Sequence, residues 1–261
     1  MNRFVVRWRI ARAGRRAAVA VMIVAAWGMP SFAADLIVRV VTEEFPPFDY
    51  TAEDGSVSGV ATEVVRAVLG ELDIDVGIEV LPWARALRLA RTDPGTLLFS
   101  VVRTPEREDQ FHWVGVVCEV KSYLFRLSER TEILPGSLSD LKGYSIGVVR
   151  DWAGQKYLEQ NGFTQLQLVA ESDSNIKKLL NGRVDLIEDY EANLIYRLDN
   201  LGFDVSLVEK VYFNADISGP LYAVLNKKTD PALVERFRDA FSRVHLDGRY
   251  EAIQRGWRLP P

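Results

Sequence analysis

The chain has 261 residues, 48% of them hydrophobic, with 36 acidic residues, 32 basic residues and two histidines. A chain of this size and apolar content can bury a sizeable core, either as one large domain or as two lobes of about 100 residues each. The single cysteine, Cys118, excludes an intramolecular disulfide, and the apolar run around it indicates structural burial.

The N-terminus has the features of a secretory signal peptide. Six arginines precede an apolar run over residues 17–27, and Pro30-Ser31-Phe32-Ala33 follows with small residues before a cleavage site. We therefore expect residues 1–33 to be removed on export to the periplasm, by the general or the twin-arginine route. Cleavage would leave 26 basic and 36 acidic residues, a formal charge of −10, which argues against nucleic acid as a partner.

The first part of the exported chain alternates strands and helices. The apolar patterns predict strands over 36–42, 76–81 and 96–102, with helices over 60–72 and 82–91. This order is typical of a parallel sheet with right-handed crossovers. The run over 96–102 is apolar throughout, which predicts a strand buried on both faces.

A second alternating set follows. It predicts strands over 145–149, 166–170 and 184–188, a short helix over 137–142, and helices over 152–161, 173–181 and 192–201, the middle one capped by Ser172. A strand over 221–225 and helices over 231–245 and 250–257 end the chain. No flexible linker separates the sets, so we expect two chain crossings between two α/β lobes, near 117–122 and 215–220.

Arg107 is the most informative single residue. Thr104-Pro105-Glu106-Arg107 follows the buried strand, and Thr with Pro predicts the start of a short helical turn. A cation in the first turn opposes the helix dipole, and ligands bind at the carboxyl ends of strands in open α/β sheets. Arg107 therefore either binds an anionic ligand group or forms a surface ion pair with Glu108 or Asp109.

Other strand-to-helix edges also carry chemistry. Phe45 lies in a proline-fixed loop after the first strand, and Trp83 with Arg85 opens a helix; each aromatic either faces a ligand or packs in the core. Asp151-Trp152 links a strand to a helix, where backbone N–H groups form a natural anion site and Asp151 could equally be only the N-cap. Carboxylates at 188–191 could meet a cationic group or could be solvated.

Catalytic and metal motifs are weak in this chain. Gly143-Tyr144-Ser145-Ile146-Gly147 matches a serine-nucleophile pattern, but a helix end precedes it and a strand follows, the reverse of the required context. His112 and His245 have no metal-ligand spacing. We expect no metal, no cofactor and no catalysis.

Five motifs in order resemble the family 3 extracellular solute-binding proteins, the type II periplasmic binding proteins of polar amino-acid ABC transport. They are FPPFDY followed by Gly59, SVVRTPEREDQFHWVG, DLKGYSIGVV, LLNGRVDLI and LDGRYEAIQRGW, and the resemblance covers residues 35–258. It implies an α/β fold of two lobes, each a mainly parallel sheet flanked by helices, joined by a two-crossing hinge. The expected domains are lobe 1, residues 34–119 and 217–261, and lobe 2, residues 120–216.

The resemblance also implies roles for individual residues. Arg107 would bind a ligand carboxylate, with contacts near Ser100 and Val102 and with Phe45 covering the ligand. An aromatic ring is usual where this chain has Arg85, and the carboxylate that usually holds the ligand ammonium falls on Tyr190, flanked by Asp189 and Glu191. The full set of expected ligand-binding residues is Phe45, Trp83, Arg85, Ser100, Val102, Arg103, Arg107, Asp151, Trp152, Asp189 and Tyr190.

These features predict a periplasmic protein that captures a small carboxylate-bearing ligand, an amino acid or a related compound, by hinge closure. Three arginines near one cleft, Arg85, Arg103 and Arg107, favour an acidic ligand. The expected partners are that ligand and an inner-membrane ABC permease or a sensor, and the protein is expected to be a monomer. Two alternatives stay open: a dehydratase-like enzyme on the same scaffold, and a ligand-sensing accessory protein without a transport role.

Overall fold

The computed structural model describes residues 39–257, which belong to one compact unit spanning 36–261. The predicted signal peptide, residues 1–33, lies outside the described residues. Within the described part of the chain, no helix is long and apolar enough to cross a membrane.

The first sheet is built around β1 (Arg39–Thr42) and β5 (Thr96–Val102). Its strand order is β4-β1-β5-β12-β6, with β4 (Ile78–Val80), β12 (Gly219–Asn226) and β6 (Phe111–Val120). Strand β1 pairs in parallel with β4 and β5, as the predicted βαβαβ pattern requires, whereas β12 runs antiparallel to β5 and β6. Every residue of β5 is buried, which confirms the prediction for this strand.

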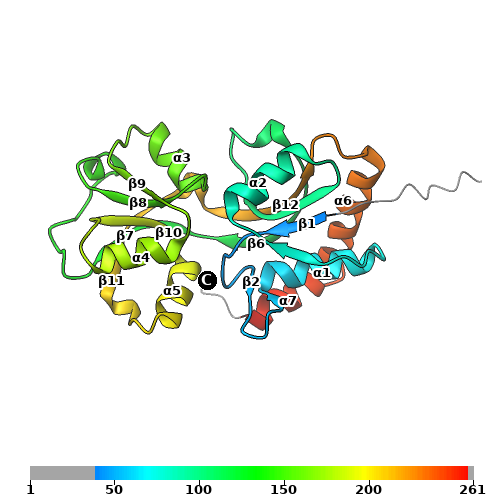
Figure 1. The fold of residues 1–261 in the computed structure, drawn as a ribbon, viewed down its shortest axis with the longest axis horizontal. Helices are drawn as coiled ribbons and strands as arrows, with labels where there is room; N and C mark the ends of the chain where they lie inside the picture. Colours follow the sequence, from blue (N-terminus) through cyan, green and yellow to red (C-terminus); the bar gives the residue numbers. More distant parts are fainter. Residues whose placement is uncertain (1–38, 258–261) are drawn as a thin grey trace, which may run out of the picture. The chain divides into compact units, whose positions relative to one another are not determined.

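Helices cover both faces of this sheet (Figure 1). Helix α2 (Trp83–Thr92) lies on one face, and α1 (Val60–Glu71) with α7 (Arg249–Trp257) lies on the other. Helix α6 (Pro231–Leu246) packs against β6 and α1, and a two-stranded ribbon, β2 (Tyr50–Thr51) with β3 (Val57–Ser58), precedes α1. We call this sheet and its helices the first lobe.

The second lobe has its own sheet, ordered β11-β7-β10-β8-β9. Strands β8 (Ile146–Val149), β9 (Leu166–Val169) and β10 (Leu186–Tyr190) are parallel, whereas β7 (Ser122–Leu127) runs antiparallel to β10 and to β11 (Val208–Phe213). Helix α3 (Ala153–Gln160) lies on one face, with α4 (Ser172–Leu180) and α5 (Glu191–Asn200) on the other (Figure 1). Both sheets are therefore mixed rather than wholly parallel.

The chain passes between the two sheets twice. The first passage is Lys121, between β6 and β7, and the second is the segment 214–218 between β11 and β12, which includes a 3-10 turn, η4 (Ala215–Ile217). Hydrogen bonds tie the passages together: Asn214 N–H donates to the Ser122 carbonyl at 2.9 Å, and Ser122 N–H donates to Ser218 Oγ at 2.9 Å. The two passages thus lie side by side, at the places where the sequence predicts them.

Several local predictions need correction. Strands β6, β7 and β11 were not expected, and β10 begins and ends two residues later than the predicted 184–188. Residues 137–142 form a 3-10 turn, η2 (Leu138–Leu141), rather than an α-helix. Ser172 is the first residue of α4 and not its cap, because its hydroxyl donates to Asp189 instead.

Candidate functional site

Arg107 lies between the two lobes. Its backbone N–H closes a turn on the Thr104 carbonyl at 2.9 Å, and the next three residues form a 3-10 turn, η1 (Glu108–Gln110). The helical turn therefore begins later than predicted, just after Arg107 rather than at Thr104. This turn points the Arg107 side chain back along the end of β5, and only 5% of the residue is exposed.

Within the described residues, the Arg107 guanidinium donates only to main-chain oxygens. Nη1 donates to the Val102 carbonyl at 3.2 Å, and Nη2 donates to the Asp151 carbonyl of the second lobe at 2.9 Å. Among residues 39–257 no ion pair involves Arg107, and Glu108 pairs instead with Arg103. The interpretation of Arg107 as a surface ion pair is therefore wrong. Burial lowers the pKa of Arg107 from its usual value, as expected for a cation without a counter-ion.

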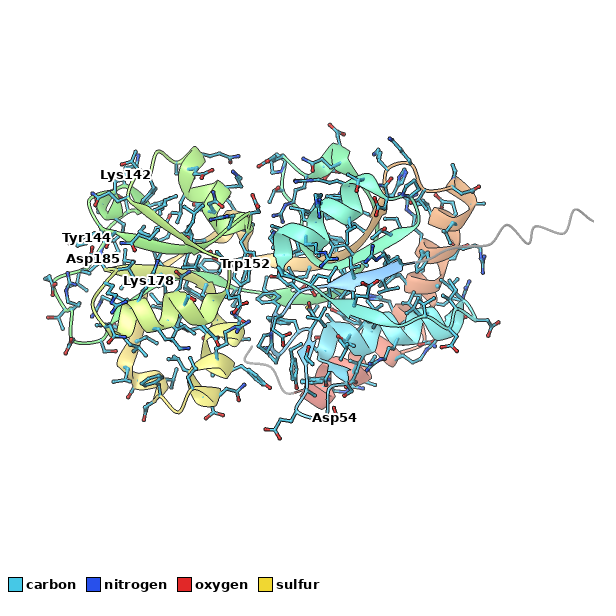
Figure 2. The ribbon with its side chains drawn as sticks, in the orientation of Figure 1. Asp54, Lys142, Tyr144, Trp152, Lys178 and Asp185 are labelled. Carbon is cyan, nitrogen blue, oxygen red and sulfur yellow. The ribbon has the colours of Figure 1, made fainter. Side chains whose placement is uncertain are left out.

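Four aromatic side chains surround this guanidinium. The Phe45 ring lies 5.3 Å from both the Trp152 and the Tyr190 rings, and Trp152 lies 5.8 Å from Tyr190. The Arg107 guanidinium lies 5.2 Å from the Trp83 ring centroid, within cation–π range. Trp152 occupies the edge of the second lobe that faces the first (Figure 2). Two aromatics from each lobe therefore enclose Arg107.

Asp151 connects the lobes through its main chain. It has a positive φ of 61°, and its carbonyl oxygen accepts from Trp83 Nε1 at 2.8 Å as well as from Arg107. Trp152, not Asp151, is the N-cap residue of α3, so the capping interpretation of Asp151 is wrong.

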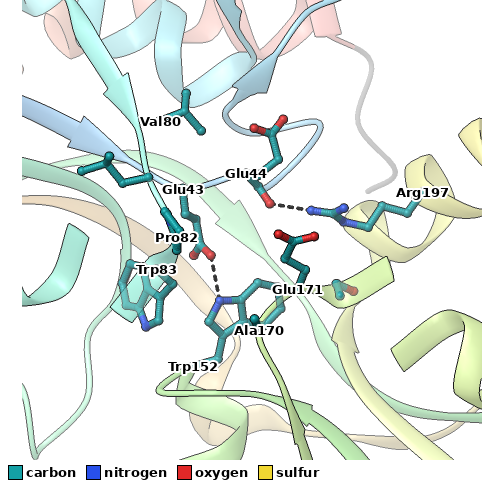
Figure 3. A pocket seen from close by; sticks show the side chains of 11 residues that line it. Glu43, Glu44, Val80, Pro82, Trp83, Trp152, Ala170, Glu171 and Arg197 are labelled. Carbon is teal, nitrogen blue, oxygen red and sulfur yellow. Dashed lines mark hydrogen bonds between the residues drawn. The ribbon is translucent and has the colours of Figure 1, made fainter. Parts of the chain in front are cut away.

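Two adjoining cavities lie at this junction. A small one, of about 10 Å³, is lined by Arg107, the four aromatics, Glu43, Ser100, Val102 and Ala153. A larger one, of about 230 Å³, shares Glu43, Trp83 and Trp152 with it and extends to Glu171 and Arg197 (Figure 3). Seven of the predicted ligand-binding residues thus line the small cavity: Phe45, Trp83, Ser100, Val102, Arg107, Trp152 and Tyr190.

Glu43 is a site residue that sequence reasoning missed. It follows β1, is 7% exposed, and its Oε2 accepts from Trp152 Nε1 of the second lobe at 2.8 Å. Burial, with the nearby charge of Asp49 as a smaller cause, raises the pKa of Glu43 to about 8. Its position at the carboxyl end of a parallel strand is the signal that could have found it.

Ser100 faces inward toward another carboxylate. Its φ is +63°, and its hydroxyl donates to Asp49, which also accepts from Thr42. Burial raises the pKa of Asp49 to about 7, against these hydrogen bonds. The Ser100 hydroxyl is thus already engaged within the first lobe.

The carboxylates around Tyr190 do not reach the cavities. Asp189 is 1% exposed and accepts from Ser172 Oγ, from Asn193 Nδ2 at 2.7 Å and from the Tyr190 N–H at 2.7 Å. Glu191 pairs with Lys210 at 2.7 Å. A shift of one residue therefore brings no carboxylate into the site, and Tyr190 itself lines the small cavity.

Two of the three predicted cleft arginines lie elsewhere. Arg85 is exposed on α2 and lines neither cavity. Arg103 is exposed, pairs with Glu108 and lies over the rings of Trp113 and Tyr222. The linings of these two cavities therefore give no support to the expectation of a three-arginine cleft.

Arg197 of α5 is a second missed residue. It is 8% exposed and donates to Asn193 Oδ1 at 3.0 Å, to Asp173 Oδ1 at 2.6 Å and to the Glu44 carbonyl of the first lobe. In the sequence it reads only as a cation in the last turn of a helix, where cations are ordinary. Its contact with the first lobe depends on tertiary packing that the sequence does not show.

No residues with the arrangement of a metal site occur in the described part: no group of three or more histidine, cysteine, aspartate or glutamate side chains there could hold an ion. The site instead offers one buried guanidinium without a counter-ion, that of Arg107, with aromatic walls and carboxylates from both lobes. This arrangement suits non-covalent binding of a small charged molecule.

Comparison with known proteins supports a common origin. The profile of the bacterial extracellular solute-binding proteins, family 3, matches residues 37–260. An L-arginine-binding protein of Pseudomonas aeruginosa is 25% identical over 236 residues, covering 87% of this chain and 89% of the relative.

Solved structures show the same fold. A histidine kinase sensor domain with similarity to periplasmic binding proteins superposes with a TM-score of 0.77 at 19% identity, covering 86% of this chain and 98% of that one. An ancestral arginine-binding protein bound to arginine gives 0.74 at 21% identity, with 85% and 97% covered. At these identities the likeness shows the fold, a type II periplasmic binding protein architecture. The class of ligand has to be inferred from the geometry of the site.

Proposed function

Because this chain belongs to the bacterial extracellular solute-binding proteins of family 3, we propose that it binds a small amino-acid-like solute between its two lobes. The observation that carries this proposal is Arg107, a guanidinium 5% exposed between the lobes whose two hydrogen bonds go to uncharged main-chain oxygens. A ligand carboxylate would supply the missing counter-charge.

The physical reason is the cost of burying an unpaired cation. Two main-chain carbonyls satisfy part of the five-donor fork of a guanidinium, but they do not neutralise its charge. A carboxylate forms shorter, charge-assisted and often bidentate hydrogen bonds with arginine. The ligand carboxylate would replace the Asp151 carbonyl on Nη2, and Phe45, Trp83 and Trp152 would enclose the apolar part of the ligand.

We propose that the lobes, residues 34–119 with 217–261 and residues 120–216, move as rigid bodies about the two passages at Lys121 and 214–218. Hinge motion of this kind needs only a few residues that absorb backbone change. Binding then shifts the population toward lobes in contact, because the ligand would touch both. The ligand-bound form would act in the periplasm and dock to an ABC permease, with no turnover of the ligand.

The cavities do not have the excess of arginines that would favour an acidic ligand. The expectation of such a ligand depended on three arginines, and Arg85 and Arg103 lie outside the cavities. The relative from Pseudomonas aeruginosa binds L-arginine. We therefore propose the broader class, a molecule with an α-carboxylate or equivalent, and test acidic, neutral and basic amino acids together.

Isothermal titration calorimetry with these three amino-acid classes tests the function. Arg107→Ala should weaken binding at least ~30-fold, since losing one charge-assisted contact in a desolvated site costs roughly 2–5 kcal/mol. Arg107→Lys should weaken it less, because lysine keeps the charge but not the fork. Arg103→Ala, which removes an exposed arginine, is the matched control.

Circular dichroism of each variant would show whether it is folded. Folded Arg107→Ala and Arg107→Lys proteins that bind as tightly as the parent would disprove the carboxylate role. Failure of the parent to bind any amino acid or simple carboxylate would disprove the proposed function as a whole.

A further inference from the structure

Arg107 accounts for only one end of a zwitterionic ligand. The three residues expected at the other end do not serve it: Asp189 is fully engaged, Glu191 pairs with Lys210, and Tyr190 carries no charge. We propose that Glu43 and Glu171, one from each lobe, form the cation-binding half of the site and hold the ammonium or guanidinium of the ligand. This inference rests on the proposed function and names its specificity.

Glu43 supplies a buried carboxylate beside Arg107. It lines both cavities, so a ligand whose carboxylate displaces the Asp151 carbonyl from Arg107 at the small cavity can reach Glu43 from the large one. Within the described residues its carboxylate has one hydrogen bond, from Trp152 Nε1 to Oε2. Oε1 is therefore left to accept from a cationic group, which would favour the charged form of a carboxyl that burial otherwise keeps protonated at neutral pH.

Glu171 supplies the second carboxylate, from the loop between β9 and α4. Although it occupies the N-cap position of α4, its side chain makes no capping hydrogen bond, and the described residues give it no ion pair. Figure 3 shows its carboxylate turned into the cavity, between Trp152 and Arg197. A glutamate that is not used by its own helix is available to a ligand.

The other charged residues of the cavity are already neutralised or turned away. The Arg197 guanidinium pairs with Asp173 at 2.6 Å, and the Glu44 carboxylate accepts from Thr51 N–H at 2.8 Å and from its hydroxyl at 3.1 Å. Glu43 and Glu171 are thus the two carboxylates that face the cavity, and Trp83 and Trp152 add aromatic faces that favour cations.

The cavity also has a suitable size. Its volume of about 230 Å³ lies below the usual range of about 300–1,000 Å³ for drug-sized ligands, as expected for a solute the size of an amino acid. A cation held by Glu43 of the first lobe and Glu171 of the second would link the lobes directly. Recognition of the cation and closure of the lobes would then be the same event.

Four related probes separate the possible sources of the cation. L-lysine carries both an α-ammonium and a side-chain ammonium, L-norleucine carries only the first, 6-aminohexanoic acid carries only the second, and hexanoate carries neither. All four contain the carboxylate that Arg107 would bind. Their affinities are measured by calorimetry for the parent, Glu43→Gln, Glu171→Gln, and Glu53→Gln as an exposed control that removes the same charge.

We expect the parent to bind at least one cationic probe more tightly than hexanoate. Glu43→Gln should weaken that probe at least ~30-fold and Glu171→Gln about 3- to 10-fold, because Glu171 is more exposed to water. Neither variant should change hexanoate binding more than Glu53→Gln does. Glutamine at position 43 preserves the acceptor for Trp152 Nε1, and Glu171 is exposed, so both variants should fold.

Two results would overturn the inference. One is a parent that prefers hexanoate to every cationic probe; the other is a pair of variants that weaken all four probes equally. In both cases sensitivity to Arg107→Ala would leave the proposed function standing. Loss of all binding in the parent would instead remove the function and this inference together.

Discussion

The sequence predicts some residues of the site but does not show which polar side chains are already hydrogen-bonded within the fold. Arg107 could be suspected from the sequence, because a cation in a first helical turn opposes the helix dipole. Asp189 could not be excluded in the same way. It is a carboxylate next to the expected position, and only the structure shows that Ser172, Asn193 and the Tyr190 backbone already occupy it.

Glu188 is a buried residue whose ionisation opposes folding. It is fully buried on β10, Oε1 accepts from Ser122 Oγ at 2.7 Å, and Oε2 has no hydrogen bond among the described residues. A Cβ at Gly154 would lie 1.8 Å from that oxygen, so only glycine leaves it room. Burial raises the pKa of Glu188 to about 8.

This pKa predicts a pH-dependent free energy of unfolding. The folded protein retains the Glu188 proton at pH values above 4.5, the usual pKa of this side chain, whereas the unfolded chain loses it there. The contribution of Glu188 to the free energy of unfolding is therefore full below pH 4.5 and is lost as the pH rises through about 8. The loss amounts to about 1.4 kcal/mol per pH unit within this window. Glu188→Gln should therefore gain stability over the parent at pH 9 and little at pH 5.

Urea unfolding at both pH values measures the difference in the free energy of unfolding between variant and parent. The raised pKa values of Asp49 and Glu43 do not affect this difference, because both residues are present in the two proteins. Glu129→Gln, which removes an exposed carboxylate from the same lobe, should show no such pH-dependent gain. A Glu188→Gln protein with the same pH profile as the parent would mean that this carboxyl does not hold its proton in the folded state.

The secondary-structure elements could be predicted in part. Strand β5 and helices α1, α2 and α6 have long, regular apolar patterns, so their existence followed from the sequence. Strands β6 and β7 were missed although they are rich in β-branched and aromatic residues. Together they run almost without interruption from Phe111 to Leu127, and the passage between them at Lys121 contains no proline or glycine that would mark two separate strands.

Helix α5 has a role that its amphipathic pattern does not reveal. Arg197 joins it to α4 through Asp173 and to the first lobe through the Glu44 carbonyl. Arg197→Lys should lower the free energy of unfolding by about 1–3 kcal/mol, because one ammonium cannot satisfy three acceptors held by a planar fork. It should also weaken ligand binding, since contact between the lobes loses one of its hydrogen bonds.

Chemical unfolding and calorimetry test both effects on the same samples. Arg150→Lys, at an exposed arginine of the same lobe, should leave stability and affinity unchanged. Unfolding and binding constants of Arg197→Lys equal to those of the parent would show that this contact forms no part of closure.

Among the described residues, four hydrogen bonds join the lobes near the cavities, beside the ring contacts of Phe45 with Trp152 and Tyr190. Trp83 and Arg107 donate to Asp151, Trp152 donates to Glu43, and Arg197 donates to Glu44. All four hydrogen bonds lie near the cavities, where loops that follow the strands of the two lobes meet. Each of these hydrogen bonds has a modest net value of about 1 kcal/mol, so together they resist separation of the lobes only weakly.

Ligand binding should therefore change the shape and the fluorescence of the protein. Small-angle scattering should show a smaller radius of gyration with saturating ligand. Tryptophan emission should shift to the blue as Trp83 and Trp152 leave water. Replacing either by phenylalanine should remove part of this shift. Trp257→Phe should not, because Trp257 bonds to Glu63 within the first lobe at 2.9 Å. Binding without either change would contradict hinge closure.

The Asp151 carbonyl has a consequence for how strongly any ligand can bind. This oxygen accepts from Trp83 and also from Arg107 Nη2, the donor that a ligand carboxylate would take. While the lobes are in contact, the protein thus contains its own competitor at a high effective concentration. The measured affinity reflects how much more strongly Arg107 binds the ligand than it binds the Asp151 carbonyl. A molecule that offers a single neutral oxygen would therefore gain almost nothing by replacing this carbonyl. The Asp151 carbonyl would thus make the site selective for ligands with a negatively charged group, and neutral molecules would not bind measurably.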